Sequence, residues 1–247
     1  MSSKARLDLL LVARGLAKSR EEAQRLILAG EVRVGDQPAA KPSQSVAADA
    51  PLVVGARPRF VSRGGEKLDG ALSALGVEVA GGVAIDVGAS TGGFADCLLG
   101  RGARRVYAVD VGYGQLDWKL RRDPRVTVIE RQNIRTLDRS AITELADLAV
   151  VDVSFISLRL VLPKVRDLLC APARIVALVK PQFEVGRGRV GKGGVVRDPA
   201  LHRQAVDGVR EVARALGLVE FGFVESPLLG PKGNREFFLG WSVPRAG

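Results

Sequence analysis

The sequence has 247 residues, of which 47% are hydrophobic and 26% charged, which is enough for a packed core in one large domain or in two smaller ones. A formal net charge of +10 indicates a polyanionic partner, either nucleic acid or an anionic membrane surface. With no apolar run of the ~18 residues that cross a bilayer, no signal-peptide pattern and only two cysteines, we expect a cytoplasmic protein without a membrane span, a disulfide framework or a metal site.

The positive charge is densest in the first 64 residues, which hold 11 Lys or Arg against 6 Asp or Glu. Apolar residues at helical spacing predict a helix over 6–14, and Ser19 starts a second helix with a capping box. An alternating strand is predicted over 31–34 and a short strand over 52–54. These elements form a small α+β module whose basic side chains are left for the surface.

This module carries the pattern R-L-D-x-x-L, then G-x-x-x-S-R-x-x-A-x-x-L-I-x-x-G-x-V-x-V-x-G. The pattern resembles the S4-type RNA-binding domain, and the resemblance implies such a domain over 1–58, followed by a linker over 59–65. A solvated charged face is the alternative interpretation. With RNA as the partner, the predicted contacts are Arg6, Arg14, Lys18, Arg20, Lys41 and, in the linker, Arg63.

The remaining residues, 66–247, alternate strand and helix patterns, which is typical of a parallel α/β sheet. A helix predicted over 66–75 has Lys67 in its first turn, where the helix dipole disfavours a cation, so Lys67 should have a local partner. His202 lies beside the apolar stripe of the last helix, so we expect it at the surface without a catalytic role. The predicted strands are 83–87, 105–110, 126–130, 147–153, 175–179, 219–224 and 236–242, and the predicted helices 91–101, 159–169 and 198–216.

A glycine-rich loop at 86–94 joins an apolar strand to a helix, as in a nucleotide-type site, but its G-x-x-x-G-G spacing is not the dinucleotide pattern. Asp110 ends the next strand, where an acid can accept both ribose hydroxyls of an adenosine group. A plain glycine turn and a loop-capping acid are the simpler alternatives. Together, however, the two features favour S-adenosylmethionine (SAM), whose carboxylate could bind the amides of residues 90–93. The predicted cofactor contacts are Asp86, Gly88, Ala89, Ser90, Thr91, Gly92, Gly93, Phe94, Asp110, Val111 and Asp152.

Charged residues stand at further strand ends. Asp152 and Lys180 each follow an apolar strand, and Glu236 opens the last one. The carboxyl ends of parallel strands converge on a ligand crevice, and an antiparallel last strand would begin at the same edge. With Lys67, two lysines and two carboxylates could share one cleft, whereas separate surface salt bridges are the alternative.

These four residues match the K-D-K-E tetrad of the FtsJ-type 2′-O-ribose RNA methyltransferases. An S4-type domain joined to such a domain resembles the TlyA family of ribosomal RNA methyltransferases, and the resemblance rests also on the strings at 62–68, 86–94, 152–157 and 180–194. It implies a Rossmann-like, seven-stranded, SAM-dependent sheet over 66–247. It further implies methyl transfer to the 2′-hydroxyl of a cytidine in 16S or 23S rRNA, or both. In that reaction Lys180 would accept the proton, Asp152 would orient it, and Lys67 and Glu236 would complete the network.

The same resemblance makes ribosomal RNA or a ribosomal subunit the expected partner, with no membrane and no obligate protein partner. The basic loop, which we define as residues 182–197, is glycine-rich, and we expect a mobile loop that grips phosphates. Phe155 could stack on an extruded base, or it could belong to the core. The predicted phosphate contacts in the loop are Arg187, Arg189 and Lys192.

Three other functions remain open. An NAD(P)-dependent oxidoreductase is disfavoured by the glycine spacing and by the lack of a His or Tyr suited to proton relay. An RNA-binding assembly factor with vestigial catalysis is disfavoured by the intact charged quartet. A haemolysin-like membrane-lytic protein has little support without an apolar span or a membrane-binding amphipathic helix.

Overall fold

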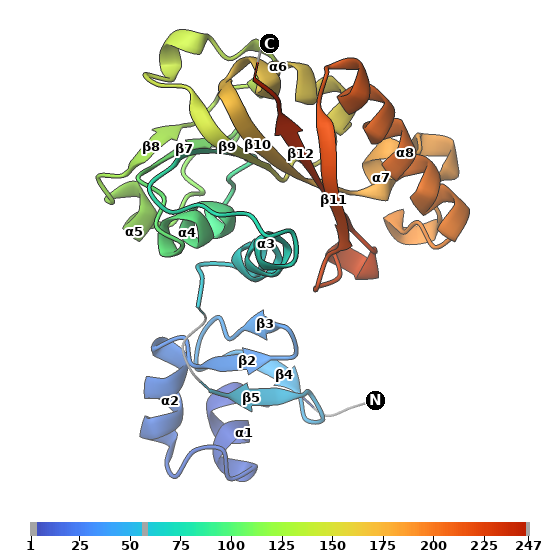
Figure 1. Ribbon diagram of the computed structural model, residues 1–247. Coiled ribbons are helices and arrows are strands. Elements are labelled where there is room, and N and C mark those ends of the chain that lie inside the picture. Colours follow the sequence, from blue (N-terminus) through green and yellow to red (C-terminus); the bar gives the residue numbers. More distant parts are fainter. Residues whose placement is uncertain (1–3, 56–58, 246–247) are drawn as a thin grey trace. The chain divides into compact units, whose positions relative to one another are not determined.

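The computed structural model describes residues 4–55 and 59–245. The chain divides into two compact units, Met1–Arg59 and Phe60–Gly247 (Figure 1). Each unit has its own apolar core and is described by itself. The proposed domain limits at 58 and 66 stay predictions.

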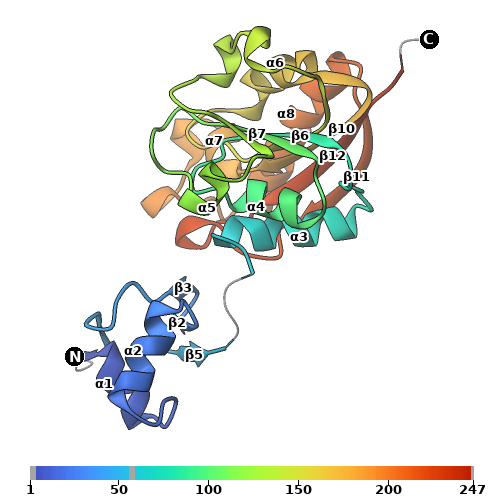
Figure 2. The same cartoon turned by 90° about the vertical axis from the view of Figure 1, so that its left-hand side faces the viewer.

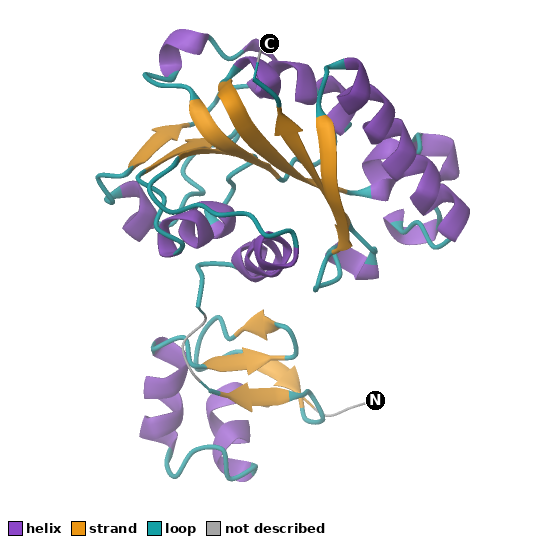
Figure 3. Ribbon diagram, in the orientation of Figure 1, coloured by secondary structure: helices purple, strands orange, loops and turns teal. Residues whose placement is uncertain are grey.

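The N-terminal unit consists of two short helices and two small antiparallel sheets (Figure 3). The predicted N-cap is present, because Ser19 Oγ accepts a hydrogen bond from Glu22 N at 3.1 Å. The return bond of the capping box differs from the prediction, since Glu22 Oε2 accepts from Lys18 N at 2.6 Å, one residue before the N-cap. One sheet pairs β1 with β4, and the other has the order β3-β2-β5. The elements are β1 (Lys4–Arg6), α1 (Leu7–Ala13), α2 (Arg20–Leu28), β2 (Val32–Val34), β3 (Gln37–Pro38), β4 (Ser45–Ala47) and β5 (Leu52–Val54).

Asp8, in the first turn of α1, is a fully buried carboxylate that holds this unit together. Its oxygens accept hydrogen bonds from Arg6 at 2.8 and 3.0 Å, from Arg20 at 3.0 Å and from Gln24 at 3.2 Å. The bonds from Arg6 are the main reason why the pKa of Asp8 lies well below its usual range. Two of the predicted RNA contacts, Arg6 and Arg20, are therefore also fixed in place by one buried acid.

The C-terminal unit is a seven-stranded sheet with the order β11-β12-β10-β9-β6-β7-β8. β12 pairs antiparallel with both of its neighbours, β10 and β11, and the other pairs of this sheet are parallel, so the predicted parallel α/β sheet is confirmed. Figures 1 and 2 show α3, α4 and α5 on one face of the sheet and α6 and α8 on the other. The strands are β6 (Val83–Val87), β7 (Arg105–Val109), β8 (Val126–Ile129), β9 (Ala146–Val151), β10 (Leu169–Val179), β11 (Val219–Glu225) and β12 (Phe237–Val243); the helices are α3 (Arg63–Ala74), α4 (Gly93–Gly100), α5 (Trp118–Arg121), α6 (Leu162–Asp167), α7 (Pro181–Glu184) and α8 (Pro199–Ala215).

Two predicted boundaries are wrong. The helix expected from residue 66 begins at Arg63, so Lys67 lies in the second turn of α3 and the dipole argument for its partner does not hold. The helix expected over 159–169 is replaced by a 3-10 turn at Leu158–Leu160 and the shorter α6. Residues from 169 onward instead join β10, with a register shift against β9.

His202 is not at the surface. Its side chain on α8 is buried, with Nε2 2.8 Å from the carbonyl oxygen of Val196 and the ring 5.6 Å from that of Phe237. The sequence prediction failed because the covering segment, at Val195 and Val196, has no helix or strand pattern of its own. His202 is an anchor for the end of the basic loop.

Replacing Asp8 by Asn should loosen the N-terminal unit, because the amide leaves Arg6 and Arg20 without a negative partner. We expect the opening free energy of α1 and α2 to fall by about 1–3 kcal/mol at pH 7, measured by native-state hydrogen exchange. Asp36→Asn, at an exposed turn, is the matched control and should change nothing.

The same measurement has a signed pH dependence. Because the pKa of Asp8 is lowered by folding, its contribution is complete above the unfolded value of about 3.9 and is lost as the pH falls through the folded value. The difference between wild type and Asp8→Asn should therefore shrink below pH 4. A difference that stays constant down to pH 2 would contradict this role.

Candidate functional site

The predicted polar residues do gather at one edge of the sheet. Asp86 lies in β6, Asp110 and Asp152 directly follow β7 and β9, and Lys180 follows β10. Because β12 is antiparallel to β10, pairing Phe237 with Val179, Glu236 also lies at this edge. The prediction that the last strand begins at the carboxyl edge is confirmed.

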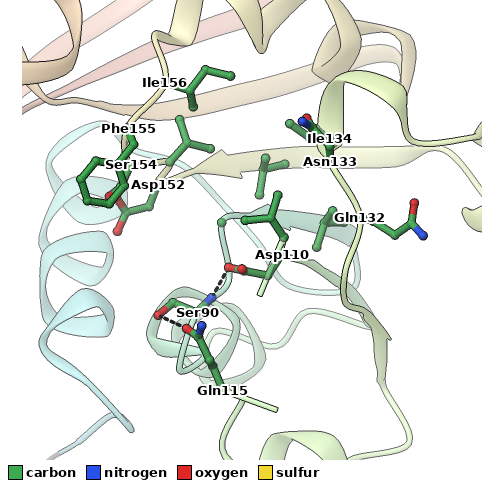
Figure 4. A pocket seen from close by; sticks show the side chains of 15 residues that line it. Ser90, Asp110, Gln115, Gln132, Asn133, Ile134, Asp152, Ser154, Phe155 and Ile156 are labelled. Carbon is green, nitrogen blue, oxygen red and sulfur yellow. Dashed lines mark hydrogen bonds between the residues drawn. The ribbon is translucent and has the colours of Figure 1, made fainter. Parts of the chain in front are cut away.

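A cavity of about 460 Å³ opens at this edge, within the size range of small-molecule sites (Figure 4). Six predicted site residues line it: Gly88, Ser90, Asp110, Val111, Asp152 and Phe155. The others of the glycine-rich loop, and Asp86, are not among its lining residues. Sequence reasoning missed Val87, Val109, Gln115, Gln132, Asn133, Ile134, Val153, Ser154 and Ile156.

Most of the missed residues lie directly after a strand on the same edge. Gln132 to Ile134 follow β8, and in Figure 4 they form the wall opposite Asp152 and Phe155. The strand-end rule applied to Asp110 and Asp152 also applies to β8. It could have found this wall, but the wall begins three residues after β8, and the charged residues that come first, Glu130 and Arg131, do not line the cavity.

Asp110 locks the glycine-rich loop to the end of β7. Its Oδ2 accepts a hydrogen bond from Ser90 N at 2.8 Å, and its Oδ1 accepts one from Gly112 N at 2.6 Å. Each carboxylate oxygen still has a second lone pair for a ligand hydroxyl. Of the amides of residues 90–93 that are expected to bind the SAM carboxylate, Ser90 N is bonded to Asp110 and Gly92 N to the carbonyl of Ala89, so a carboxylate at these two amides would compete with contacts within the protein.

Asp86 is fully buried and neither of its carboxyl oxygens has a hydrogen-bond partner among the residues described. Burial raises the pKa of Asp86 well above its usual range, and the nearby charge of Asp152 raises it further. A buried polar group without a partner costs stability. Asp86 directly precedes Val87 and Gly88, which line the cavity, although Asp86 itself is not among the lining residues.

Gly88 is required by a close approach of two loops. A Cβ at this position would lie 2.4 Å from the carbonyl oxygen of Asp152, and the residue has a φ of +88°. Both constraints exclude other residues. The first glycine of the G-x-x-x-G-G pattern therefore brings the carboxyl ends of β6 and β9 together, which places Asp110 and Asp152 around one cavity.

The four charged residues form two ion pairs. Lys180 Nζ lies 2.5 Å from Asp152 Oδ1 and 3.0 Å from Ser154 Oγ. Lys67 Nζ lies 2.6 Å from Glu236 Oε2, and both of these side chains are buried. The partner expected for Lys67 is therefore confirmed. Of the four residues, only Asp152 lines the cavity, so a single shared cleft remains a prediction.

Phe155 does not belong to the core. Its side chain is 91% exposed, it has a φ of +66°, and its ring lies 5.1 Å from that of Phe183. A bulky residue with positive φ is strained, and such strain persists only where the surroundings determine the conformation. The loop after β9 therefore holds an aromatic ring open to solvent at the rim of the cavity.

The basic loop is less free than expected. It begins in α7 and ends at the buried Val195 and Val196, where Val196 N donates a hydrogen bond to Asn234 Oδ1 at 3.0 Å. Its middle is exposed and includes Lys192, and Arg189 donates a hydrogen bond to Gln204 at 2.6 Å. Both ends of the loop are thus held by contacts, and its mobility stays a prediction. The side chain of Arg187 lies outside the described residues.

The other predicted RNA contacts differ in their surroundings. Lys18 and Lys41 are exposed, whereas Arg14 donates hydrogen bonds to the carbonyl oxygens of Ala48 and Ala50. Arg63 is half-buried at the start of α3. In the described part of the chain, no helix is both long and apolar enough to cross a membrane, and no group of three or more His, Cys, Asp or Glu residues is arranged to hold a metal ion.

Comparisons with known proteins match both units. Residues 60–242 match the FtsJ-like methyltransferase family, and residues 5–50 match the S4 domain. The 16S/23S rRNA (cytidine-2′-O)-methyltransferase TlyA of Mycobacterium tuberculosis is 52% identical over 241 residues, covering 97% of this chain and 90% of the relative.

Solved structures agree with this match. A Streptococcus thermophilus protein that carries the name hemolysin has a TM-score of 0.77 and 40% identity, covering 100% of this chain and 90% of that one. The N-methyltransferase NodS of Bradyrhizobium japonicum, solved with S-adenosyl-L-homocysteine, has a TM-score of 0.52 and 17% identity, covering 74% of this chain and 86% of that one. At this identity, the similarity to NodS shows a shared fold and nothing more.

Gly88→Ala should cost more stability than Gly76→Ala. Both residues have positive φ, but nothing lies within 4 Å of a Cβ at Gly76. The backbone strain common to both should cost about 1–2 kcal/mol, and the clash at Gly88 should add about 1–3 kcal/mol. Urea unfolding measures the difference, and equal losses would show that the approach of Gly88 to Asp152 is not tight.

Proposed function

Because the chain belongs to the TlyA-type family of rRNA (cytidine-2′-O)-methyltransferases, in which an S4 domain precedes an FtsJ-like methyltransferase domain, we propose that it methylates the 2′-hydroxyl of a cytidine in 16S or 23S rRNA, or both. The observation that carries the proposal is the Lys180–Asp152 ion pair at the wall of the cavity. A lysine fixed beside a carboxylate at a ligand site can handle the proton of a ribose hydroxyl.

The residues around the cavity fit SAM. Asp110 has free lone pairs for two ribose hydroxyls, and Asp86 has carboxyl oxygens without a partner among the described residues. The apolar side chains of Val111 and Ile134 line the same cavity and suit the flat face of an adenine. When bound, SAM supplies a methyl group on a sulfonium, and S-adenosylhomocysteine is left after the transfer.

The reacting hydroxyl would sit near Asp152, and Lys180 would take its proton as a neutral amine, after releasing its own proton to solvent. Asp152 Oδ1 and Ser154 Oγ hold the Lys180 amine in one place. Proton transfer of this kind contributes ~10²–10⁴-fold, whereas alignment of the reacting atoms can supply ~7–11 kcal/mol. Alignment of the sulfonium methyl with the ribose oxygen therefore contributes more to the rate than the proton transfer does. Lys67 and Glu236 support the site from the buried ion pair behind it.

The exposed ring of Phe155 is suited to stack on the target base. It lines the cavity that holds Asp152, and its open face is free for a second ring. Base–aromatic stacking contributes ~1–3 kcal/mol per base. This offsets part of the few kcal/mol needed to extrude a cytidine from a helix. The exposed Lys18, Lys41 and Lys192 would bind phosphates.

Replacing Lys180 by Ala should lower the methyl-transfer rate by ~10²-fold or more, because the proton acceptor is lost. SAM affinity should stay within a few-fold, since Lys180 is not among the residues that line the cavity. Lys180→Arg should not rescue the rate, because a guanidinium stays protonated. Lys119→Ala, at an exposed lysine paired with Asp96, is the control. Tritiated methyl transfer to ribosomal subunits measures the rates, and near-normal transfer by Lys180→Ala would remove Lys180 from this role.

RNA affinity should fall steeply with salt, because each phosphate that the protein neutralises releases counterions. Lys18→Ala and Lys41→Ala should each reduce the slope of log K against log salt by about 1. Arg125→Ala is the control, since Arg125 is paired with Asp123 and precedes β8 at the opposite edge of the sheet. A filter-binding titration with an rRNA fragment measures the slopes, and a wild-type slope near zero would mean that the basic surfaces are misassigned.

A further inference from the structure

Glu184 is a buried carboxyl group that none of the proposed steps uses. It ends α7, one helical turn after Lys180, and its side chain is 2% exposed. Burial raises the pKa of Glu184 above its usual range. Its ionic partner is Arg159, whose Nε lies 3.6 Å from Glu184 Oε2. Burying an acid is unfavourable even with such a partner, so the fold gains nothing from it unless the contacts of the acid hold a segment in place.

The hydrogen bonds of Glu184 all cross to the loop that follows β9. Ser157 Oγ donates to Glu184 Oε2 at 2.5 Å, and Leu158 N donates to Glu184 Oε1 at 2.8 Å. Arg159 adds a hydrogen bond from its guanidinium to the carbonyl oxygen of Glu184 at 3.1 Å. Both carboxylate oxygens are thus bound to one short segment, residues 157–158.

The two loops joined in this way carry the proposed reacting groups. Residues 152–156 supply Asp152, Ser154 and Phe155, and the other loop supplies Lys180. Lys180 itself connects the two loops through its contacts with Asp152 and Ser154. Glu184, four residues further along the chain, connects them a second time through residues 157–158. Two connections fix both distance and angle, whereas the Lys180 contact alone would leave a hinge.

The geometry of Phe155 shows that the loop is held at both ends. Its positive φ is unfavourable for an aromatic residue, and its ring lies beside Phe183, the neighbour of Glu184. Residues 153–156 join Asp152, which is paired with Lys180, to Ser157, which is bonded to Glu184. The strained turn at Phe155 lies within that span.

We propose that Glu184 is a positioning residue for methyl transfer, which locks the Asp152–Phe155 loop to the Lys180 loop through Ser157 and Leu158. This inference rests on the proposed function, because it assigns Glu184 to the same reaction. Glu184 does not touch the reacting atoms, since it lines a separate cavity of about 600 Å³ with Arg159, Arg189 and Glu211. Its effect is on the alignment of Lys180 with Asp152.

The test compares three variants of the full-length protein, which separate the length of the side chain at position 184 from its charge. Glu184→Gln keeps the reach, because its carbonyl can accept from Leu158 N and its amide can donate to Ser157 Oγ. Glu184→Asp keeps the charge but is one methylene too short, and Glu184→Ala loses both. Glu211→Ala, at an exposed acid lining the same 600 Å³ cavity from α8, is the matched control.

The single-turnover methyl-transfer rate should fall by about 10²-fold in Glu184→Ala, since a misplacement of about 1 Å costs that much. Glu184→Asp should fall similarly, Glu184→Gln should stay within a few-fold of wild type, and Glu211→Ala should be unchanged. SAM affinity, measured by calorimetry, should stay within about two-fold of wild type in all four variants, because Asp110 and Ile134, which line the proposed SAM site, are not changed. Thermal unfolding of the same samples checks that each variant is folded.

Three outcomes would overturn the inference: a wild-type rate in Glu184→Ala, a higher rate in Glu184→Asp than in Glu184→Gln, or a rate loss accompanied by an equal loss of SAM binding. The second outcome would assign Glu184 a role through its charge, and the third a role in overall folding. If the wild-type protein methylates no rRNA in the same assay while it binds SAM, the proposed function fails instead.

Discussion

The buried ion pair between Lys67 and Glu236 is the contact on which the carboxyl edge of the sheet depends. It joins α3, near the start of its unit, to the residue before β12, 169 positions later in the chain. Removing one partner of a buried pair typically costs ~3–5 kcal/mol, because the other charge is left without a counterion. The pair therefore fixes α3 against the end of the sheet.

Glycines make this arrangement possible. A Cβ at Gly65 would lie 2.4 Å from the ring of Phe60, and one at Gly93 would lie 2.2 Å from Ser62 Oγ, so α3 and α4 pack more closely than larger residues allow. A Cβ at Gly230 would lie 2.0 Å from Glu236 Oε1. Gly230 leaves the space that the Glu236 carboxylate occupies, and Gly93 allows the close approach of the first turns of α3 and α4.

The sequence was sufficient where a local pattern directly determines position. Strand-end residues such as Asp110, Asp152 and Lys180 could be placed at one edge, because the order of strands and helices fixes which ends converge. It was insufficient where contacts join segments without a pattern. His202, Asp8 and Glu184 are buried by loops or by arginines whose approach no periodicity encodes. The wall at Gln132 to Ile134 begins three residues after β8, beyond the position that directly follows the strand.

The cost of burying polar groups is concentrated at this same edge. In the described part of the C-terminal unit, Asp86 has two buried oxygens without a hydrogen-bond partner, Glu236 has one, and burial raises the pKa of both Asp86 and Glu184. A sheet stabilised only for its fold would place apolar residues at these positions, since buried acids lower stability. Proteins break such local rules mainly at functional sites. The buried acids at the carboxyl edge are therefore best explained by ligand binding. The close-packed glycines and the two ion pairs stabilise the rest of the unit against the cost of burying these acids.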